Sequence, residues 1–184
     1  MEQIPDSKIL ELLNGDNPNY GFNLLMKKYK QPLYYTIRQM VIIHEDADDI
    51  LQNVFIKVWK NIHTFKKEAK LYTWLYRIAV NETLNFLNAK KRRFFLPIHD
   101  YNKELSAKIS QDPLFSGDDI QKLLQKAILQ LPDKQRLVFN MKYFQEMKYE
   151  EIAEILGTSV GALKANYHHA VKKIEEFLSG ELNH

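Results

Sequence analysis

The sequence predicts an all-α protein of two small helical domains joined by a flexible linker, and three observations support this fold class. Apolar residues recur three or four positions apart along most of the chain, which is the spacing of an amphipathic helix. No stretch alternates apolar and polar residues as a half-buried strand does. Between residues 97 and 117 the periodicity fades, and two of the six prolines occur there. We therefore place a first domain at residues 1–96, a linker at 97–118 and a second domain at 119–184.

Three long helices are expected in the first domain. Residues 22–40 carry apolar side chains at helical spacing, and Pro32 is expected to kink or interrupt this helix because proline lacks an amide proton. Residues 46–62 sustain an apolar stripe for more than four turns, with Trp59 among the expected core positions. Residues 72–89 also carry apolar side chains at helical spacing, which predicts the third long helix. The periodicity therefore predicts a helical bundle for this half of the chain.

Four helices are expected in the second domain, and most of them are shorter. We place them at residues 119–131, 133–144, 149–156 and 159–178, and Pro132 separates the first two. The last two helices are separated by a brief connection that contains a glycine. These short, closely spaced helices indicate a compact recognition motif at the end of the chain.

The segment from residue 149 to residue 174 predicts a helix-turn-helix. Ala153 is small where the two helices must approach closely, and Gly157 can take the left-handed conformation that ends the first helix. Ser159 is a good N-cap for the second helix. Turn, cap and apolar spacing therefore agree on the same motif. The residues expected to form its shared core are Ile152, Leu156, Val160, Leu163, Val171 and Ile174.

In a helix-turn-helix the second helix enters the major groove of DNA, with its N-terminal half facing the base edges. Lysine can contact guanine and asparagine can contact adenine in that groove. An ordinary helical hairpin with a solvated polar face is the alternative, and we favour DNA binding because turn, cap and core coincide. The outward-facing candidates are Ser159, Gly161, Lys164, Ala165, Asn166, His168, His169 and Lys172.

A basic segment lies in the first domain, although the net charge of the whole chain is only +3. Residues 57–93 contain ten basic and two acidic side chains, interleaved with aromatic residues. Basic side chains follow phosphates and aromatic rings stack on bases, so this combination suits single-stranded DNA. Two alternatives remain at this point. Residues 90–93 can simply complement a helix C-terminus, and Trp74 can be a core residue.

The polar face of the helix at residues 46–62 indicates a protein partner. Its stripe at helical spacing consists of Asp49, Gln52, Asn53 and Ile56. An exposed apolar side chain in this polar setting, at Ile56, is typical of an interface. The alternative is that the acidic residues of the first turn only stabilise the N-terminus of the helix.

Several classes of function are excluded by what the sequence lacks. There are no cysteines, so neither disulfides nor thiolate-bound metals are available. The nucleotide loops GxGxxG and GxxxxGK[ST] and the enzyme motifs GxSxG and HExxH do not occur. Consecutive carboxylates or histidines on a helix diverge by about 100°, so no metal site is expected. We expect no cofactor, no catalytic residue and no small-molecule substrate. With neither a signal peptide nor a membrane span visible, a cytoplasmic protein is expected.

Three stretches together resemble a bacterial RNA polymerase sigma factor of the compact extracytoplasmic-function (ECF) type, a branch of the sigma-70 family. They are DADDILQNVFIKVW, YTWLYRIAVNETLNFLNAKKRR and LPDKQRLVFNMKYFQEMKYEEIAEILGTSVGALK. The resemblance covers roughly residues 20–95 and 119–178. It implies a protein that binds core RNA polymerase and directs promoter recognition and transcription initiation, with no catalysis of its own.

The resemblance assigns the polymerase contacts. Residues 46–62 are similar to the helix that docks on the clamp helices of the polymerase β′ subunit. The second domain is expected to touch the β flap, and an anti-sigma factor is a further expected partner. The core-polymerase-binding residues that this similarity implies are Asp48, Asp49, Gln52, Asn53 and Ile56.

The resemblance also assigns the promoter contacts. Residues 65–72 resemble the loop that captures a base flipped out of the −10 element, Asn81 matches a position that helps to read it, and residues 159–173 match the helix that reads the −35 element. The pocket that holds the flipped base offsets the free-energy cost of opening the duplex. The implied −10 residues are Phe65, Lys66, Lys67, Lys70, Tyr72, Trp74, Arg77, Asn81, Lys90, Arg92 and Arg93.

Two other classes of protein are alternatives to the sigma factor. A regulator that binds operator DNA without polymerase would account for the helix-turn-helix and leave the first domain unexplained. A helical nuclease or metal-dependent hydrolase would need convergent carboxylates and histidines, which the spacing does not provide. Affinity for core polymerase would distinguish a sigma factor from the operator-binding regulator. Loss of an activity on chelation would identify the nuclease or hydrolase.

Overall fold

The computed structural model describes residues 4–65, 69–94, 105–109, 112, 115 and 119–182. These residues form helices, turns and short connections, and none of them lies in a strand, which confirms the all-α prediction. The elements are α1 (Asp6–Asn14), α2 (Pro18–Val41), α3 (His44–Asn61), the 3-10 turn η1 (Ile62–Thr64), α4 (Leu71–Phe94), α6 (Asp119–Leu129), α7 (Asp133–Tyr143), α8 (Tyr149–Leu156) and α9 (Val160–Leu182).

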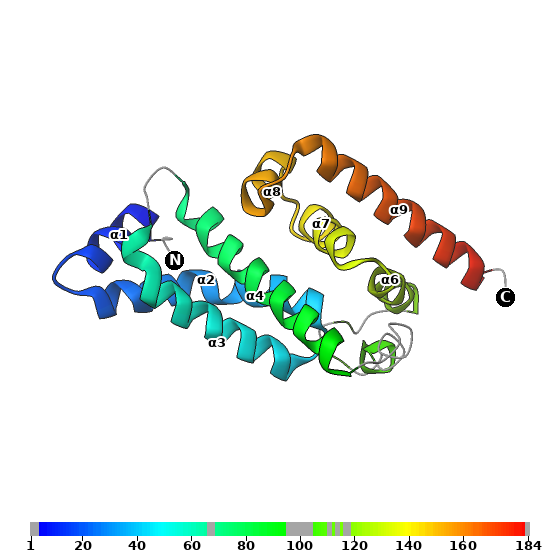
Figure 1. The fold of residues 1–184 in the computed structure, drawn as a ribbon, viewed down its shortest axis with the longest axis horizontal. Helices are drawn as coiled ribbons and strands as arrows, with labels where there is room; N and C mark the ends of the chain where they lie inside the picture. Colours follow the sequence, from blue (N-terminus) through cyan, green and yellow to red (C-terminus); the bar gives the residue numbers. More distant parts are fainter. Residues whose placement is uncertain are drawn as a thin grey trace.

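Helices α1 to α4 form the N-terminal bundle (Figure 1). The long helices α2, α3 and α4 bury their apolar stripes against one another, and Leu33, Val54 and Leu75 are fully buried. Helix α1, which the periodicity did not predict, is tied to α2 by Asp6, whose carboxylate accepts hydrogen bonds from Lys28 at 2.6 Å and Tyr29 at 2.8 Å. The predicted bundle is therefore confirmed and enlarged by one helix.

Two features of α2 depend on its packing. The helix continues through Pro32 to Val41, so the proline does not interrupt it, and the expected kink stays a prediction. Burial of Leu33 and Ile37 just beyond the proline compensates for the one amide hydrogen bond that it removes. At the other end of the helix, a Cβ on Gly21 would lie only 2.8 Å from the backbone nitrogen of Leu13. Glycine is therefore what allows α1 and α2 to approach so closely.

The segment predicted as a linker contains a short packed stretch. Residues 105–109 are helical, and Leu105, Ile109 and Phe115 are buried in a cluster with Ile42 and Leu129. The buried guanidinium of Arg38 pairs with Asp112 and lies 5.0 Å from the ring of Phe115. Side-chain packing therefore orders part of a segment in which the sequence alone predicted no regular element.

The C-terminal helices α6 to α9 lie along one side of the N-terminal bundle, with α9 on the outside (Figure 1). One cluster of buried residues belongs to this half alone and includes Ala127, Phe139 and Ala170. A second set, on α7, α8 and α9, joins the buried cluster of the N-terminal bundle; it includes Leu137, Val138, Met141, Ile152, Ile155 and Leu163. The buried apolar region therefore runs across the boundary between the two expected domains. Among the described residues, no helix has the length and apolar character needed to span a membrane.

Candidate functional site

The turn between α8 and α9 has the geometry that the sequence predicts. Gly157 has a φ of 62°, in the left-handed region, and its amide donates to the carbonyl of Ala153 at 2.9 Å. Ser159 Oγ accepts a hydrogen bond from the amide of Ala162 at 3.2 Å, which caps α9. Glycine is required at the turn because an L side chain rarely adopts this φ. The helix-turn-helix is confirmed in both its turn and its cap.

The prediction of one shared core for the motif is wrong. Ile152, Leu156 and Leu163 pack in the cluster that includes the N-terminal bundle, whereas Val171 and Ile174 pack against the cluster of α6 and α7. The cause is the length of α9, whose 23 residues carry its two ends to different neighbours. The motif therefore packs against both the N-terminal bundle and helices α6 and α7.

The outward face of α9 is open. Ser159, Gly161, Lys164 and the other candidate DNA-reading residues are exposed, except that Asn166 is half-buried and its amide donates to the carbonyl of Ala162 at 3.0 Å. The exposed members of this set are Ser159, Gly161, Lys164, Ala165, His168, His169 and Lys172. They form one accessible surface, as a helix that enters the major groove requires.

Sequence reasoning missed an aromatic residue beside this surface. The ring of Tyr149, the first residue of α8, lies 5.8 Å from Lys164 Nζ and 5.1 Å from Lys142 Nζ. It also meets Tyr167 edge-on, and burial raises the pKa of the Tyr149 phenol, so the ring stays neutral at physiological pH. Its place at the start of a helix gave no sign of this contact.

The rings of the adjacent histidines of α9 are tilted relative to each other. The ring centroids of His168 and His169 are 5.9 Å apart and the planes differ by 54°. In the described part of the chain, no three His, Asp or Glu side chains gather closely enough to hold a metal ion.

Aromatic side chains of the basic segment form two packed pairs on α4 and the residues before it. Phe65 lies 5.5 Å from Trp74, and Tyr72 lies 4.2 Å from Tyr76, between ring centroids. Burial is the main cause that raises the pKa of the Tyr72 and Tyr76 phenols, so both hydroxyls remain protonated donors. Phe65, Tyr72 and Trp74 are half-buried, so each ring is both a packing element and partly accessible.

The polar and cationic residues proposed for the −10 contact differ in their surroundings. Lys70, Arg77, Asn81 and Arg92 are exposed, and Arg77 donates a hydrogen bond to the backbone carbonyl of Glu154 in α8. Lys90 is largely buried and pairs at 2.5 Å with Asp46 of α3. Lys66 and Lys67, together with the side chain of Arg93, lie outside the described residues.

The polar stripe of α3 borders an apolar groove between α2 and α3. Asp48, Asp49, Gln52, Asn53 and Ile56 are all exposed, with Ile56 at 45 %. All of them except Asn53 line a groove of about 870 Å³. The remaining lining residues are Asn19, Phe22, Asn23, Met26, Lys30, Leu51, Phe55 and Trp59.

The prediction that Trp59 of α3 is a core residue is wrong. It was expected in the core, but it is 43 % exposed and its ring lies 4.9 Å from Phe22, on the wall of the groove. Its position is at the edge of the apolar stripe, where the indole packs against Phe22 and is otherwise open to the groove. Together with Ile56 it gives the groove two exposed large apolar side chains, which is typical of a protein interface.

Comparisons with known proteins agree with this arrangement. Residues 25–93 match the family described as Sigma-70 region 2, and residues 121–174 match Sigma-70, region 4. The chain is 32 % identical to the ECF RNA polymerase sigma factor SigW of Bacillus subtilis (strain 168), over 97 % of this chain and 98 % of that protein. It is 29 % identical to the ECF RNA polymerase sigma-E factor of Escherichia coli (strain K12), over 95 % and 94 %.

Two solved structures share the fold. The sigma factor RpoE in complex with the anti-sigma factor NepR, from Bartonella quintana, has a TM-score of 0.65 at 21 % identity, over 86 % of this chain and 96 % of that one. CnrH in complex with the cytosolic domain of CnrY has a TM-score of 0.66 at 20 % identity, over 95 % of this chain and 94 % of that one. The match extends over both helical halves.

Proposed function

The chain belongs to the ECF sigma factors of the sigma-70 family, and from this premise we propose which of its surfaces make each contact of transcription initiation. As a sigma factor it binds core RNA polymerase and promoter DNA and directs transcription initiation. The observation that carries the assignment is the presence, in one chain, of an open helix-turn-helix and of a helical bundle with a basic aromatic helix and an apolar groove.

We assign the polymerase contact to the groove between α2 and α3. Its floor is apolar, and Asp48 and Asp49 place two carboxylates at its rim. Such a groove fits helices that carry apolar side chains flanked by basic ones, and the family implies the clamp helices of the β′ subunit. Ile56 and Trp59 are the proposed anchors because large, partly exposed apolar side chains carry most of the energy in such interfaces.

The −10 contact is assigned to α4 and the residues just before it. Lys70, Arg77 and Arg92 can neutralise phosphates, and Asn81 presents an exposed amide for a base edge. Aromatic rings at positions 65, 72 and 74 lie at or just before the N-terminal end of α4. A flipped base held there would offset the few kcal/mol that unstacking costs, so DNA opening would need no chemical step by this chain.

The −35 contact is assigned to the outward face of α9. Lys164 is placed to contact guanine, while Lys172 and the cap at Ser159 are placed for phosphates. The identity of the −35 sequence would then depend chiefly on the first three turns of α9. The same C-terminal half is the proposed contact for the β flap.

Three further properties follow from this role. We propose that the chain acts in the cytoplasm, where polymerase and chromosome are found, and that it catalyses no reaction, because the polymerase supplies the chemistry. An anti-sigma protein is a proposed partner, since a structure with the same fold contains the anti-sigma factor NepR. No small-molecule substrate or cofactor is part of the proposal.

The polymerase assignment is tested with Ile56→Asp. A carboxylate in the apolar groove would have to be desolvated on binding, so we expect at least tenfold weaker association with core polymerase and unchanged helicity. Asn85→Asp is the control, because it adds a carboxylate at an exposed position of α4 that does not line the groove and lies outside the C-terminal half. Equal association of the two variants, measured by fluorescence anisotropy of labelled chain, would show that the groove is not the docking site.

A further inference from the structure

The reading face of α9 has a lysine beside an aromatic ring that belongs to α8. We infer that Tyr149 is a positioning residue for promoter recognition, whose ring holds the ammonium group of Lys164 at the place where that group meets one base pair of the −35 element. The inference rests on the proposed −35 role of Lys164. It adds a specificity-determining residue that lies outside the helix proposed to read the DNA.

The contact between the two side chains is a cation–π interaction. Lys164 is exposed in the second turn of α9, and its Nζ lies 5.8 Å from the ring of Tyr149. A cation within about 6 Å of a ring centroid is attracted to the negative face of the ring. A free lysine side chain loses much rotamer freedom when it contacts a base, and a ring that already restricts the ammonium group lowers this loss. The ring therefore favours the one base pair that Lys164 can reach from this position.

The ring of Tyr149 is itself fixed by a row of aromatic side chains. Tyr149 is half-buried and meets Tyr167 edge-on, with the ring centroids 6.4 Å apart. Tyr167 in turn stacks on Phe139 at 5.7 Å, and Phe139 is 4 % exposed within the buried cluster of the C-terminal half. The orientation of the Tyr149 ring is therefore set by the core of this half.

A second lysine supports the same ring. Lys142, near the end of α7, has its Nζ 5.1 Å from the ring of Tyr149 and donates a hydrogen bond to the carbonyl of Met147 at 3.1 Å. Because this hydrogen bond holds the Lys142 ammonium in place, Lys142 is a fixed neighbour of the ring. Lys164 makes the contact from the exposed face of α9, where its ammonium group stays accessible to DNA.

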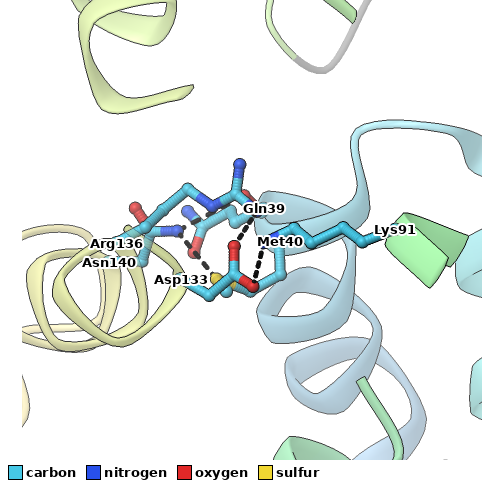
Figure 2. A network of polar contacts seen from close by, with 6 residues as sticks. All are labelled: Gln39, Met40, Lys91, Asp133, Arg136 and Asn140. Atoms are coloured by element: carbon cyan, nitrogen blue, oxygen red, sulfur yellow. Dashed lines mark hydrogen bonds and ion pairs between the residues drawn. The ribbon is translucent and has the colours of Figure 1, made fainter. Parts of the chain in front are cut away.

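Helix α7, which carries Lys142, is also anchored (Figure 2). Asn140 is 2 % exposed, and its Nδ2 donates to the carbonyl of Gln39 in α2 at 3.3 Å. At the start of the same helix, Asp133 pairs with Lys91 of α4 at 2.5 Å. The end of α7 is therefore a firm support for Lys142 and for the ring beside it.

A ring suits this task better than a carboxylate would. Within the described part of the chain, Lys164 forms no ion pair with an acidic side chain. A carboxylate would hold the ammonium group but would also cancel its charge and repel the phosphates of DNA. Burial raises the pKa of the Tyr149 phenol, so the ring is neutral at physiological pH and leaves the positive charge of Lys164 intact.

The contact is tested first in the free chain by nuclear magnetic resonance with isotope-labelled lysine. Protons above an aromatic face are shielded, so the ε-methylene protons of Lys164 should resonate upfield of those of Lys173, which is exposed on the same helix. Lys164→Ala identifies the signal by removing it. Tyr149→Leu should abolish the upfield shift, and Tyr149→Phe, which keeps the ring, should retain it. Equal resonances of Lys164 and Lys173 in the parent would overturn the contact without any variant of Tyr149.

The effect on recognition is tested with the holoenzyme formed from the full chain and bacterial core polymerase. The template is the promoter most used by the parent holoenzyme in a pool of genomic DNA, together with its single-base variants in the −35 element, transcribed in competition. We expect Tyr149→Leu to lower discrimination about threefold at the base pair that Lys164→Ala affects, which is the size of an exposed cation–π contact. Tyr149→Phe should retain the parent's discrimination, and Tyr149→Leu in the Lys164→Ala background should lower it no further.

The outcomes separate the inference from the proposed role of Lys164. If Lys164→Ala lowers discrimination at one base pair and Tyr149→Leu does not, Lys164 reads that base without help from the ring and the positioning role is overturned. A loss in Tyr149→Phe as large as that in Tyr149→Leu would assign the effect to the hydroxyl and would also overturn it. If Lys164→Ala affects all promoter variants equally, the base contact proposed for Lys164 fails, and the positioning role fails with it.

Discussion

The two proposed DNA contacts are built in opposite ways. In the helix-turn-helix, the turn at Gly157, the cap at Ser159 and the reading face of α9 are close in sequence, so local conformation sets their geometry. On α4, the surroundings of the contact residues come from distant segments, as Glu154 does at Arg77 and Asp46 does at Lys90. Sequence motifs therefore describe the first contact well, while the second is decided by tertiary packing.

The largest expected effect is on the free energy of unfolding, when the core beneath α4 is changed. Leu75 is 0 % exposed, and Leu75→Ala should lower the free energy of unfolding by about 3 kcal/mol through lost burial and a cavity. Leu84→Ala, at a half-buried position of the same helix, should cost clearly less. Urea unfolding followed by the fluorescence of Trp59 and Trp74, both in the N-terminal bundle, measures the two losses. Equal losses would contradict the described core.

The DNA contact of α9 is tested at Lys164. Lys164→Ala should weaken binding to the preferred −35 duplex by about 2 kcal/mol and should reduce discrimination at one base pair. The control Lys173→Ala removes the same charge from an exposed position outside the proposed face. Competition binding with single-base variants measures the discrimination. If all duplexes lose affinity equally, Lys164 contacts only phosphate.

The local nature of the turn is tested at Gly157. Gly157→Ala forces an L side chain into a φ of 62° and should lower the free energy of unfolding by about 1.5 kcal/mol. Gly180→Ala places the same methyl group in open space within α9, where it should be neutral or stabilising. Thermal unfolding followed by circular dichroism compares the two variants. Equal midpoints would mean that the turn carries no conformational requirement.

The smallest expected effect is at the cap of α9. Ser159→Ala removes the acceptor for the amide of Ala162 and should cost about 1 kcal/mol, whereas Ser159→Gly should cost only a few tenths. Urea unfolding with the circular dichroism signal resolves the difference. A larger loss for glycine than for alanine would show that side-chain contacts other than the cap stabilise this position.

The sequence predicted the features that depend on local geometry. Helical periodicity gave the all-α class, and the chemistry of Gly157 and Ser159 gave the turn and cap, because each rests on backbone preferences of a few residues. Polar neighbours also marked Ile56 as exposed. These inferences needed no knowledge of which helices meet.

The features that the sequence did not predict depend on distant neighbours. Trp59 has helical spacing suitable for a core residue, and only the packing of α2 leaves it on a groove wall. The burial of Leu105 and Ile109 needs Ile42, just after α2, and Leu129 of α6 as partners. The contact between Arg77 and Glu154 joins residues that are 77 positions apart. Periodicity contains no information on such pairings.

The central claim is that this chain gives core RNA polymerase its promoter specificity through two separate DNA contacts. The most direct measurement mixes the purified chain with bacterial core polymerase and sequences the transcripts made from a pool of genomic DNA. We expect a stable complex that selects promoters sharing a −10 and a −35 element. Specific duplex binding by the chain alone, with no polymerase complex and no selected transcripts, would contradict the claim.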